Sequence, residues 1–406
     1  MKEIFLINVW GQDKPGVTRV VTEVLSNFEV TVLDIGQAVI HDQLNLGILA
    51  AVPRSEDSET LIKAVQNSLL ALEMQVMFSP ITEQRYKQWV GQQGKARYIV
   101  TLLARKIEPE HLAAVATVTS EYGLNIDKIL RLSGRMELDE NEQLGRACVE
   151  FSVRGEPKDA VLFKSALLEL AGTYDIDVAY QEDNIFRRNR RLVVFDMDST
   201  LIDAEVIDEL AREAGVGDQV AAITEAAMQG EIDFKASFTQ RMALLKGLDA
   251  NVLQSVAERL RLNEGAEHLI STLKKLGFKT AIVSGGFTFF GEYLQQRLGV
   301  DYVYANQLDI EDGLVTGRVT GEIIDGQRKA ELLRQIAERE GLMLQQVIAV
   351  GDGANDLPML SIAGLGIAFR AKPLVKASAK QSISNLGLDG ILYLLGYSDK
   401  DTLILD

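Results

Sequence analysis

The sequence predicts two α+β units in succession, followed by an α/β unit with a parallel sheet. Three observations support this fold class. The order strand, helix, strand, strand, helix, strand occurs over residues 1–80 and again over residues 97–181. From residue 192 onward, short β-rich runs alternate with long helical stretches, which is typical of a parallel sheet. A chain of 406 residues also has room for two or three domains, at about 150 residues per domain.

The first two units both follow the βαββαβ order of ferredoxin-like folds. In the first unit, the spacing of apolar residues predicts strands at residues 3–9, 30–39, 47–52 and 75–79, and helices at residues 16–28 and 58–72. In the second unit, it predicts strands at residues 97–104, 125–132, 147–153 and 175–180, and helices at residues 109–122 and 158–170. The polar stretch 82–95 separates the copies, so we expect domains at residues 1–82 and 94–183.

The third unit, over residues 190–406, contains three apolar runs that each end at a polar or glycine-rich turn. Residues 192–195 lead into Asp196, residues 281–283 into Ser284, and residues 347–350 into Gly351 and Asp352. Ligands bind outside the carboxyl ends of the strands in open parallel sheets. We therefore expect a Rossmann-like sheet with one site formed by three strand ends.

The segment between the first two of these strand ends predicts a separate helical element. It has about eighty residues, too many for a plain crossover, and residues 204–214 and 234–245 have strong helical patterns. We expect a helical cap at about residues 204–265, which would exclude water and contact a substrate. Residues 303–324, with Asp312 and Gly313 at the turn, predict a β-hairpin that supports the cap.

The strand ends gather four acidic residues. Asp196 and Asp198 follow the first strand, and Asp352 and Asp356 lie on a glycine-rich turn after the third. Two unit charges 4 Å apart repel by about 4 kcal/mol at an effective dielectric constant of 20, so positive charge must lie among them. Oxygen ligands without imidazole or thiolate favour a hard divalent cation, most plausibly Mg²⁺. Lys329 is the candidate second positive charge.

Together these groups predict phosphoryl transfer through an aspartyl-phosphate. One carboxylate can attack phosphorus once Mg²⁺ and Lys329 neutralise the phosphoryl charge, and the acid two residues on can protonate the leaving alkoxide. Ser284 and the amides of Gly285 and Gly286 offer donors to phosphate oxygens. Taken singly, each motif has a plain alternative: a turn or weak calcium site, a loop, or a solvated lysine.

Four motifs resemble those of haloacid-dehalogenase-superfamily phosphatases. They are Asp196-Met197-Asp198-Ser199-Thr200, Ser284-Gly285-Gly286, Lys329 and Gly351-Asp352-Gly353-Ala354-Asn355-Asp356. The resemblance implies a haloacid-dehalogenase-like fold with Asp196 as nucleophile and Asp198 as general acid and then base. It also implies Mg²⁺ held by Asp196, the main-chain carbonyl of Asp198 and Asp352. Asp356 would support the metal through its waters or hydrogen bonds.

Two charges in the predicted cap suit a zwitterionic substrate. Glu205 could bind an ammonium group and Arg241 could clamp a carboxylate, although helix charges of this kind are mostly solvated. The chain also resembles the phosphoserine phosphatase family at its substrate-contacting positions, which are Glu205, Met228, Phe234, Arg241, Ser284, Gly285, Lys329 and Asn355. This implies hydrolysis of O-phospho-L-serine to L-serine and phosphate, the last step of serine biosynthesis.

The loop at residues 11–16 is a candidate ligand site in the first unit. A helix amino terminus attracts a carboxylate, and Asp13 could meet an ammonium group; the alternative is a plain Gly/Pro turn. The loop resembles the ligand loop of ACT domains, which implies L-serine as an effector near Asp13 and Gly16, and a homodimer. The matching residues 104–109 of the second unit lack both glycines and the aspartate, so a packing role is expected there.

Composition excludes several classes of function. The net charge of −16 argues against nucleic-acid binding, and no apolar run exceeds five residues, whereas a membrane span needs about 20. One cysteine, Cys148, favours a reducing compartment, so we expect a cytoplasmic protein in which Cys148 is a small buried hydrophobe. The basic run at residues 187–191 is interpreted as a solvated linker rather than a nucleic-acid or phosphate patch.

A second hypothesis comes from a different class of protein. The chain could be an amino-acid sensor whose phosphatase domain is vestigial or acts on another phosphorylated metabolite. The intact acids at the strand ends and Lys329 favour the enzyme.

Overall fold

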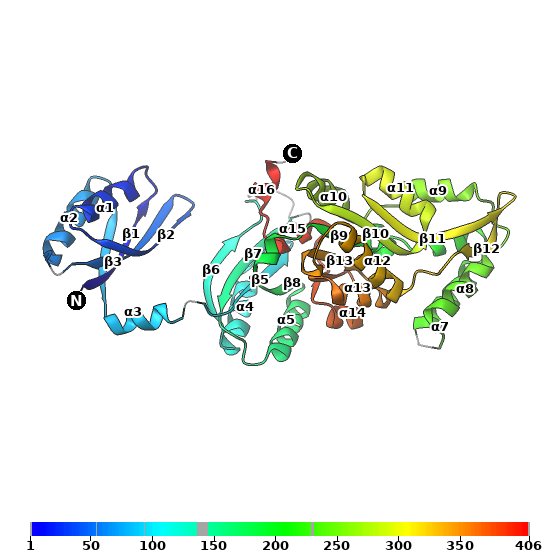
Figure 1. Cartoon of the computed structure of the whole chain (residues 1–406), viewed down its shortest axis with the longest axis horizontal. Helices are drawn as coiled ribbons and strands as arrows, with labels where there is room; N and C mark the ends of the chain where they lie inside the picture. Colours follow the sequence, from blue (N-terminus) through cyan, green and yellow to red (C-terminus); the bar gives the residue numbers. More distant parts are fainter. Residues whose placement is uncertain (1, 54, 93, 136–144, 229–230, 405–406) are drawn as a thin grey trace. The chain divides into compact units, whose positions relative to one another are not determined.

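The computed structural model describes residues 2–53, 55–92, 94–135, 145–228 and 231–404, with the side chain of Met228 outside the described part (Figure 1). The chain forms two compact units, Met1–Lys95 and Ala96–Asp406. The second unit contains both the second α+β fold and the α/β fold. The predicted βαββαβ repeats and the predicted parallel sheet are confirmed. The exact domain boundaries stay predictions.

The first unit is an antiparallel sheet with two helices on one face. Its strands, in the sheet order β2, β3, β1, β4, are Thr31–Ile40, Gln43–Val52, Glu3–Gln12 and Gln75–Ile81. The helices are α1, Val17–Ser26, and α2, Ser58–Leu70. Alternate residues of β3, such as Leu46 and Ile48, are buried against Val21 and Val65 of the helices.

The polar stretch 82–95, which was predicted to separate the repeats, contains a helix that its composition does not indicate. Helix α3, Glu83–Val90, begins at Thr82, whose hydroxyl accepts a hydrogen bond from the Arg85 amide. None of its residues is buried. Apolar periodicity therefore could not reveal α3, because the helix depends on local capping and on the Lys87–Glu83 ion pair.

The second α+β fold has the same topology but a more deeply buried sheet. Its strands, in the order β6, β7, β5, β8, are Asn125–Arg131, Ala147–Arg154, Arg97–Ala104 and Asp177–Glu182; its helices are α4, Pro109–Glu121, and α5, Ala160–Tyr174. Strands β5, β7 and β8 are buried on both faces, whereas the edge strand β6 is exposed. Phe151 packs on the helices, while Leu103 and Cys148 join the same core cluster as Phe195 of the α/β fold. Cys148 is fully buried, as expected for a small hydrophobe.

The α/β fold is a seven-stranded sheet in the order β12, β11, β10, β9, β13, β14, β15. These strands are Leu314–Thr320, Tyr302–Glu311, Lys279–Phe287, Leu192–Phe195, Val347–Gly351, Leu365–Phe369 and Gln381–Ile383. All neighbours are parallel except β11 and β12, which form the predicted hairpin. Asp312 and Gly313 both have positive φ at its turn.

Helices cover both faces of this sheet. Helices α10, Ala266–Lys275, and α11, Thr288–Leu298, lie on one face, and α12, Gly326–Arg339, and α13, Leu357–Ile362, lie on the other. The remaining short helices are α14, Pro373–Ser378, α15, Ile391–Leu394, and α16, Asp399–Leu403. The cap consists of α6, Val206–Glu213, α7, Gly217–Met228, α8, Phe234–Leu244, and α9, Val252–Arg259. Helix α8 packs on the hairpin strand β12 (Figure 1), as predicted for a supporting hairpin.

The prediction of a solvated linker at residues 187–191 is wrong for two of its arginines. Arg187 is 1% exposed and forms an ion pair with Glu150 of β7, and Arg190 is 5% exposed. Both lie in or beside a short 3₁₀ helix, Ile185–Arg188, that leads from the second sheet into β9. Because Glu150 is buried on that sheet, it requires a cationic partner, and Arg187 supplies it.

In the described part of the chain, no helix combines the length and the apolar character that crossing a lipid bilayer requires.

Candidate active site

The three strand ends singled out in the sequence are neighbours in the sheet. Strand β9 lies between β10 and β13, and Phe195 is in register with Ile282 on one side and Val350 on the other. Asp196 directly follows β9, and its amide donates to the Val350 carbonyl at 2.8 Å. The predicted convergence of the motifs at one edge of the sheet is therefore confirmed.

The chain leaves β9 through a tight turn, residues 196–201, which we call the acidic turn. The Asp196 Oδ1 atom accepts a hydrogen bond from the Met197 amide at 2.8 Å, and Ser199 adopts a left-handed φ of 54°. A residue other than glycine in that conformation costs about 1 kcal/mol or more, and such strain is common where a turn must aim side chains. The turn directs Asp196 and Asp198 toward the same crevice, where both are mostly buried.

Lys329 lies between two carboxylates. Its Nζ is 2.8 Å from Asp196 Oδ1 and 2.7 Å from Asp356 Oδ1, and its side chain is fully buried. Burial alone would lower the pKa of Lys329, but the two carboxylates outweigh it and raise the pKa above its ordinary value. Lys329 is therefore charged. It is held in place by α12, whose first turn is capped by the Asp325 side chain.

Three carboxylates form a cluster suited to a divalent cation. Oxygen atoms of Asp196, Asp352 and Asp356 lie within 4.8 Å of one another. Burial, and then the charge of Asp196, raises the pKa of Asp352 to about 8 and that of Asp356 to about 6. One lysine does not balance three acids, and the donors are all oxygen, which is the ligand type preferred by hard divalent ions. The residues therefore fit a Mg²⁺-type ion.

Asp198 has an environment that favours its protonated form. Burial first, then the charges of Glu205 and Asp196, raise the pKa of Asp198 well above its ordinary value. The Val206 amide donates to Asp198 Oδ1 at 3.2 Å. On its other side the carboxyl group faces Gly286, where an added Cβ would lie 2.6 Å from Asp198 Oδ2. Only glycine at position 286 leaves room for this carboxyl group.

The Ser284 motif is placed as predicted, with one difference. Ser284 is fully buried in β10, and its Oγ accepts a hydrogen bond from the Gly286 amide at 2.9 Å. The sequence interpretation used the amides of both Gly285 and Gly286 as phosphate donors. In this structure the Gly286 N–H is directed to Ser284, so the Gly285 amide and the Ser284 hydroxyl are the donors that remain.

The cap brings its charged pair to the crevice. The Ser199 hydroxyl donates to Glu205 Oε1 at 2.9 Å. Glu205 keeps contact with solvent at the mouth of the crevice, yet partial desolvation by the surrounding protein raises its pKa, against the lowering effect of the Ser199 bond. Burial lowers the pKa of Arg241, and Glu205 opposes this shift. The buried Nε of Arg241 has no hydrogen-bond partner among the described residues.

Two further predicted residues lie beside these groups, and one cannot be assessed. The ring of Phe234 reaches Gly285, because a Cβ added there would lie 3.3 Å from Phe234 Cζ. Asn355 lies on the turn between Gly353 and Asp356, half-buried. Met228 ends α7, but its side chain lies outside the described residues.

Sequence reasoning missed two residues of this region and the contact of a third. Asp208, one helical turn after Glu205 on α6, acts electrostatically on Arg241, and its spacing of three residues was an available signal. The Thr200 hydroxyl donates to Asp352 Oδ1 at 3.0 Å. The buried Asn263 side chain donates to carbonyl groups of the acidic turn. Thr200 belongs to the acidic motif identified in the sequence, which gave it no role, whereas nothing in the local sequence marks Asn263, because its carbonyl partners are distant in the chain.

The loop predicted to bind a ligand in the first unit has the expected turn geometry. Gly16 has a φ of 96° and immediately precedes α1, where no side chain caps the first turn. The Asp13 amide donates to the Asp42 carbonyl at 2.7 Å. Lys14 donates to Glu73 and to the Leu72 carbonyl, which ties the loop to the start of β4. The helix amino terminus is therefore left open.

Comparison with known proteins agrees with this geometry. Residues 193–361 match the model of haloacid dehalogenase-like hydrolases, and residues 3–79 match the model of the ACT domain. Phosphoserine phosphatase of Streptomyces coelicolor is 41% identical over 98% of this chain and 93% of its own length. Phosphoserine phosphatase SerB2 of Mycobacterium tuberculosis is also 41% identical, over 96% of this chain and 92% of its own.

A solved structure has the same organisation. The probable phosphoserine phosphatase of Vibrio cholerae, in its unliganded form, superposes with a TM-score of 0.59 and is 33% identical. The match covers 77% of this chain and 90% of that protein. The near-complete coverage of the two sequence relatives, in both directions, extends the likeness beyond the catalytic fold alone. The chain belongs to the phosphoserine phosphatase family of haloacid dehalogenase-like hydrolases, with an ACT domain at its amino terminus.

Proposed function

We propose that this chain hydrolyses O-phospho-L-serine to L-serine and phosphate, with Asp196 as nucleophile and Mg²⁺ as cofactor. The observation that carries the proposal is the way Asp196 is held. Lys329 and the Met197 amide both contact Oδ1, and the described residues donate nothing to Oδ2. One carboxylate oxygen is thus fixed, while the other is free to attack phosphorus in line.

The cofactor belongs at the carboxylates of Asp196, Asp352 and Asp356 and, by family resemblance, at the main-chain carbonyl of Asp198. A bound divalent ion would supply charge neutralisation for the phosphoryl oxygens. Lys329, Ser284 and the Gly285 amide would hold the same phosphoryl group from the protein side.

Asp198 is proposed as the general acid of the first step. Attack by Asp196 Oδ2 forms the aspartyl-phosphate, and the serine alkoxide leaves with the proton of Asp198. In the second step, the Asp198 carboxylate takes a proton from water, which attacks phosphorus and releases phosphate and Asp196. The raised pKa of Asp198 supports this order, because burial and the neighbouring acids favour the protonated form that the first step requires.

The substrate would be held by the cap. We assign the carboxylate of phosphoserine to Arg241 and its ammonium to Glu205, with Phe234, Met228 and Asn355 completing the pocket. The buried Nε of Arg241, which has no hydrogen-bond partner among the described residues, supports this assignment, because a buried N–H group without an acceptor is stabilised by one from a ligand.

Phosphate release from phosphoserine tests the mechanism. Asp196→Asn should abolish turnover and EDTA should suppress it, whereas the control Asp203→Asn, an exposed residue just after the acidic turn, should keep it. Full activity of Asp196→Asn would reject the nucleophile.

Phosphoethanolamine, which lacks the carboxylate, tests the substrate assignment. Arg241→Gln should raise the KM for phosphoserine and spare phosphoethanolamine. An equal effect of Arg241→Gln on both substrates would reject the carboxylate clamp.

For the amino-terminal half, we propose that L-serine binds at Asp13 and Gly16 and that the chain forms a homodimer in the cytoplasm. The open amino terminus of α1 supports a carboxylate ligand. Calorimetric titration of L-serine into the full chain and into Asp13→Asn tests the site. Binding of equal strength by both proteins would place the ligand elsewhere.

A further inference from the structure

A single buried side chain holds the outer side of the acidic turn. Asn263 is 5% exposed and lies where the chain returns from the cap to the sheet. Its Nδ2 donates to the carbonyls of Ser199, Thr200 and Ile202, at 3.3, 2.9 and 3.2 Å. The backbone N–H of Asn263 donates to the Leu201 carbonyl at 2.8 Å. Asn263 thereby satisfies backbone acceptors that would otherwise be left unpaired.

The orientation of Asn263 is set by Arg370, which follows β14. Arg370 Nη1 donates to Asn263 Oδ1 at 3.3 Å, which turns the Nδ2 atom toward the acidic turn. Arg370 Nη2 donates to Glu264 Oε2 at 3.1 Å, and the guanidinium lies 5.2 Å from the centre of the Phe369 ring. One guanidinium therefore links two consecutive residues of the returning segment.

Glu264 in turn is bound by the second α+β fold. Arg105, directly after β5, donates from Nη1 and Nη2 to the two carboxylate oxygens of Glu264, both at 2.7 Å. Such a bidentate contact fixes the orientation of the Glu264 carboxylate as well as its distance from Arg105. Arg105 lies in the stretch that corresponds to the ligand loop of the first unit, the stretch for which a packing role was predicted.

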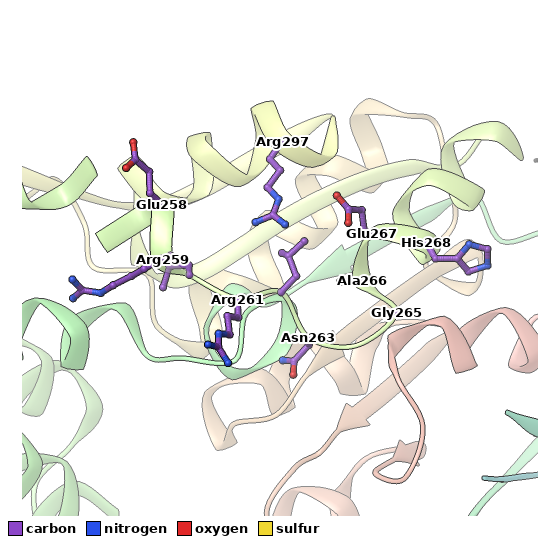
Figure 2. Close-up of a pocket in the computed structure, with 11 residues that line it drawn as sticks. Glu258, Arg259, Arg261, Asn263, Gly265, Ala266, Glu267, His268 and Arg297 are labelled. Atoms are coloured by element: carbon purple, nitrogen blue, oxygen red, sulfur yellow. The ribbon is translucent and has the colours of Figure 1, made fainter. Parts of the chain in front are cut away.

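The returning segment is packed on one side, where Leu260 and Ala266 are buried in the core cluster that contains Phe195. It borders a cavity of about 700 Å³ lined by residues 258–263, residues 265–268 and Arg297 (Figure 2). The hydrogen bonds of Asn263 and Glu264 add to this packing and give the segment a defined direction.

We propose that the network Arg105, Glu264, Arg370 and Asn263, here called the relay, positions the acidic turn and makes the turnover rate depend on the second α+β fold. All four are positioning residues, because they act on Asp196 through the turn and not on the substrate. This inference rests on the proposed function for its kinetic readout. Its structural readout, the protection of the turn amides, is independent of that function.

Glu264→Gln is the main test, because it removes the charge that both arginines share and keeps the shape of the side chain. Misplacement of a nucleophile by a fraction of an ångström lowers kcat, so we expect a loss of about tenfold or more with KM within about twofold. Arg105→Gln should give a similar loss, and the double variant should equal the single ones within about twofold, because the residues act in series. Arg105→Lys should recover only part of kcat.

Hydrogen exchange of residues 197–204 supplies the second measurement. Glu264→Gln should speed exchange in this segment, above all at the amides of Ser199 and Asp203, which donate to the carbonyls of Ala204 and Arg261 in the wild type. The matched control is Lys164→Met, which removes a contact between α5 and the Ala379 carbonyl, another bond between the same two folds. The control should change neither kcat nor exchange.

Wild-type kcat together with wild-type exchange in Glu264→Gln would overturn the relay. An equal loss of kcat and of exchange protection in Lys164→Met would also overturn the relay, because any contact between the two folds would then position the acidic turn equally well. If the wild-type protein turned over no phosphoserine, the proposed function would fall, while the exchange data would still decide the positioning role.

Discussion

Replacing Gly286 by alanine should disable the general acid without substituting any catalytic side chain. The added Cβ would lie 2.6 Å from Asp198 Oδ2 and 2.6 Å from Met197 Cε, whereas ordinary contact begins near 3.4 Å. The distance between the Cβ and Asp198 Oδ2 must therefore increase by 3.4 − 2.6 = 0.8 Å, and we expect displacement of the Asp198 carboxyl group to supply most of it. A displacement near 1 Å costs about 100-fold in rate, or about 2.7 kcal/mol in activation free energy. Overpacking should also lower the free energy of unfolding by about 1–3 kcal/mol.

The assay compares two substrates that differ in their need for a proton. The alkoxide of phosphoserine requires protonation on leaving, whereas p-nitrophenolate does not. Gly286→Ala should therefore lose far more kcat with phosphoserine than with p-nitrophenyl phosphate. The control is Gly172→Ala in α5, where the added Cβ meets nothing within 4 Å. Retention of phosphoserine turnover within about twofold by Gly286→Ala would refute the reasoning about Asp198.

Three further outcomes follow from the structure. In metal-free protein, the pKa of Asp352 is raised to about 8 from 3.8, so the folded state binds more protons than the unfolded state between these pH values. Thermal stability should therefore fall as pH rises from 4 to 8. Added Mg²⁺ should restore Tm at pH 8, and a Tm that rises with pH in the absence of metal would contradict this. Lys235 on α8 forms an ion pair with Asp325 at 3.0 Å, which links the cap to the start of α12. In steady-state kinetics, Lys235→Met should raise KM by about two- to fivefold with little effect on kcat. An unchanged KM would show that this ion pair does not help to position the cap. Glu150→Gln should leave the Arg187 charge buried without a counter-ion and lower the free energy of unfolding by about 3 kcal/mol in urea titrations, and a loss below about 0.5 kcal/mol would show that the pair is dispensable.

The parallel sheet and the location of the site were predictable because the acidic motifs lie at strand ends. Apolar runs such as residues 192–195 and 347–350 identify strands, and the carboxyl ends of parallel neighbours share one edge. Asp196 and Asp352 could therefore be assigned to one crevice before any geometry was known, and Lys329 was added as the positive charge that the acids require and by family resemblance. Their pKa shifts could not, since these depend on burial and on distances that only the fold creates.

The unpredicted features all depend on contacts between distant segments. Arg187 appeared solvated because its partner Glu150 is far along the chain, and both are buried only when two folds meet. Residues 99–104 of β5 form an almost continuous apolar run, which is typical of a strand buried on both faces. The sequence did not indicate which part of the chain covers the second face of this strand. Asn263 had no signal at all, because an asparagine after a cap is an ordinary loop residue until its carbonyl partners are known.

Trapping the covalent state tests the central claim most directly. The protein would be mixed with Mg²⁺ and phosphoserine carrying a labelled phosphoryl group, quenched in acid within the first turnovers, digested and mapped by mass spectrometry. The mechanism predicts one phosphoryl group on Asp196 in the wild type and none in Asp196→Asn. Label on another residue, such as Ser284, or steady turnover with no covalent label at any quench time, would contradict it.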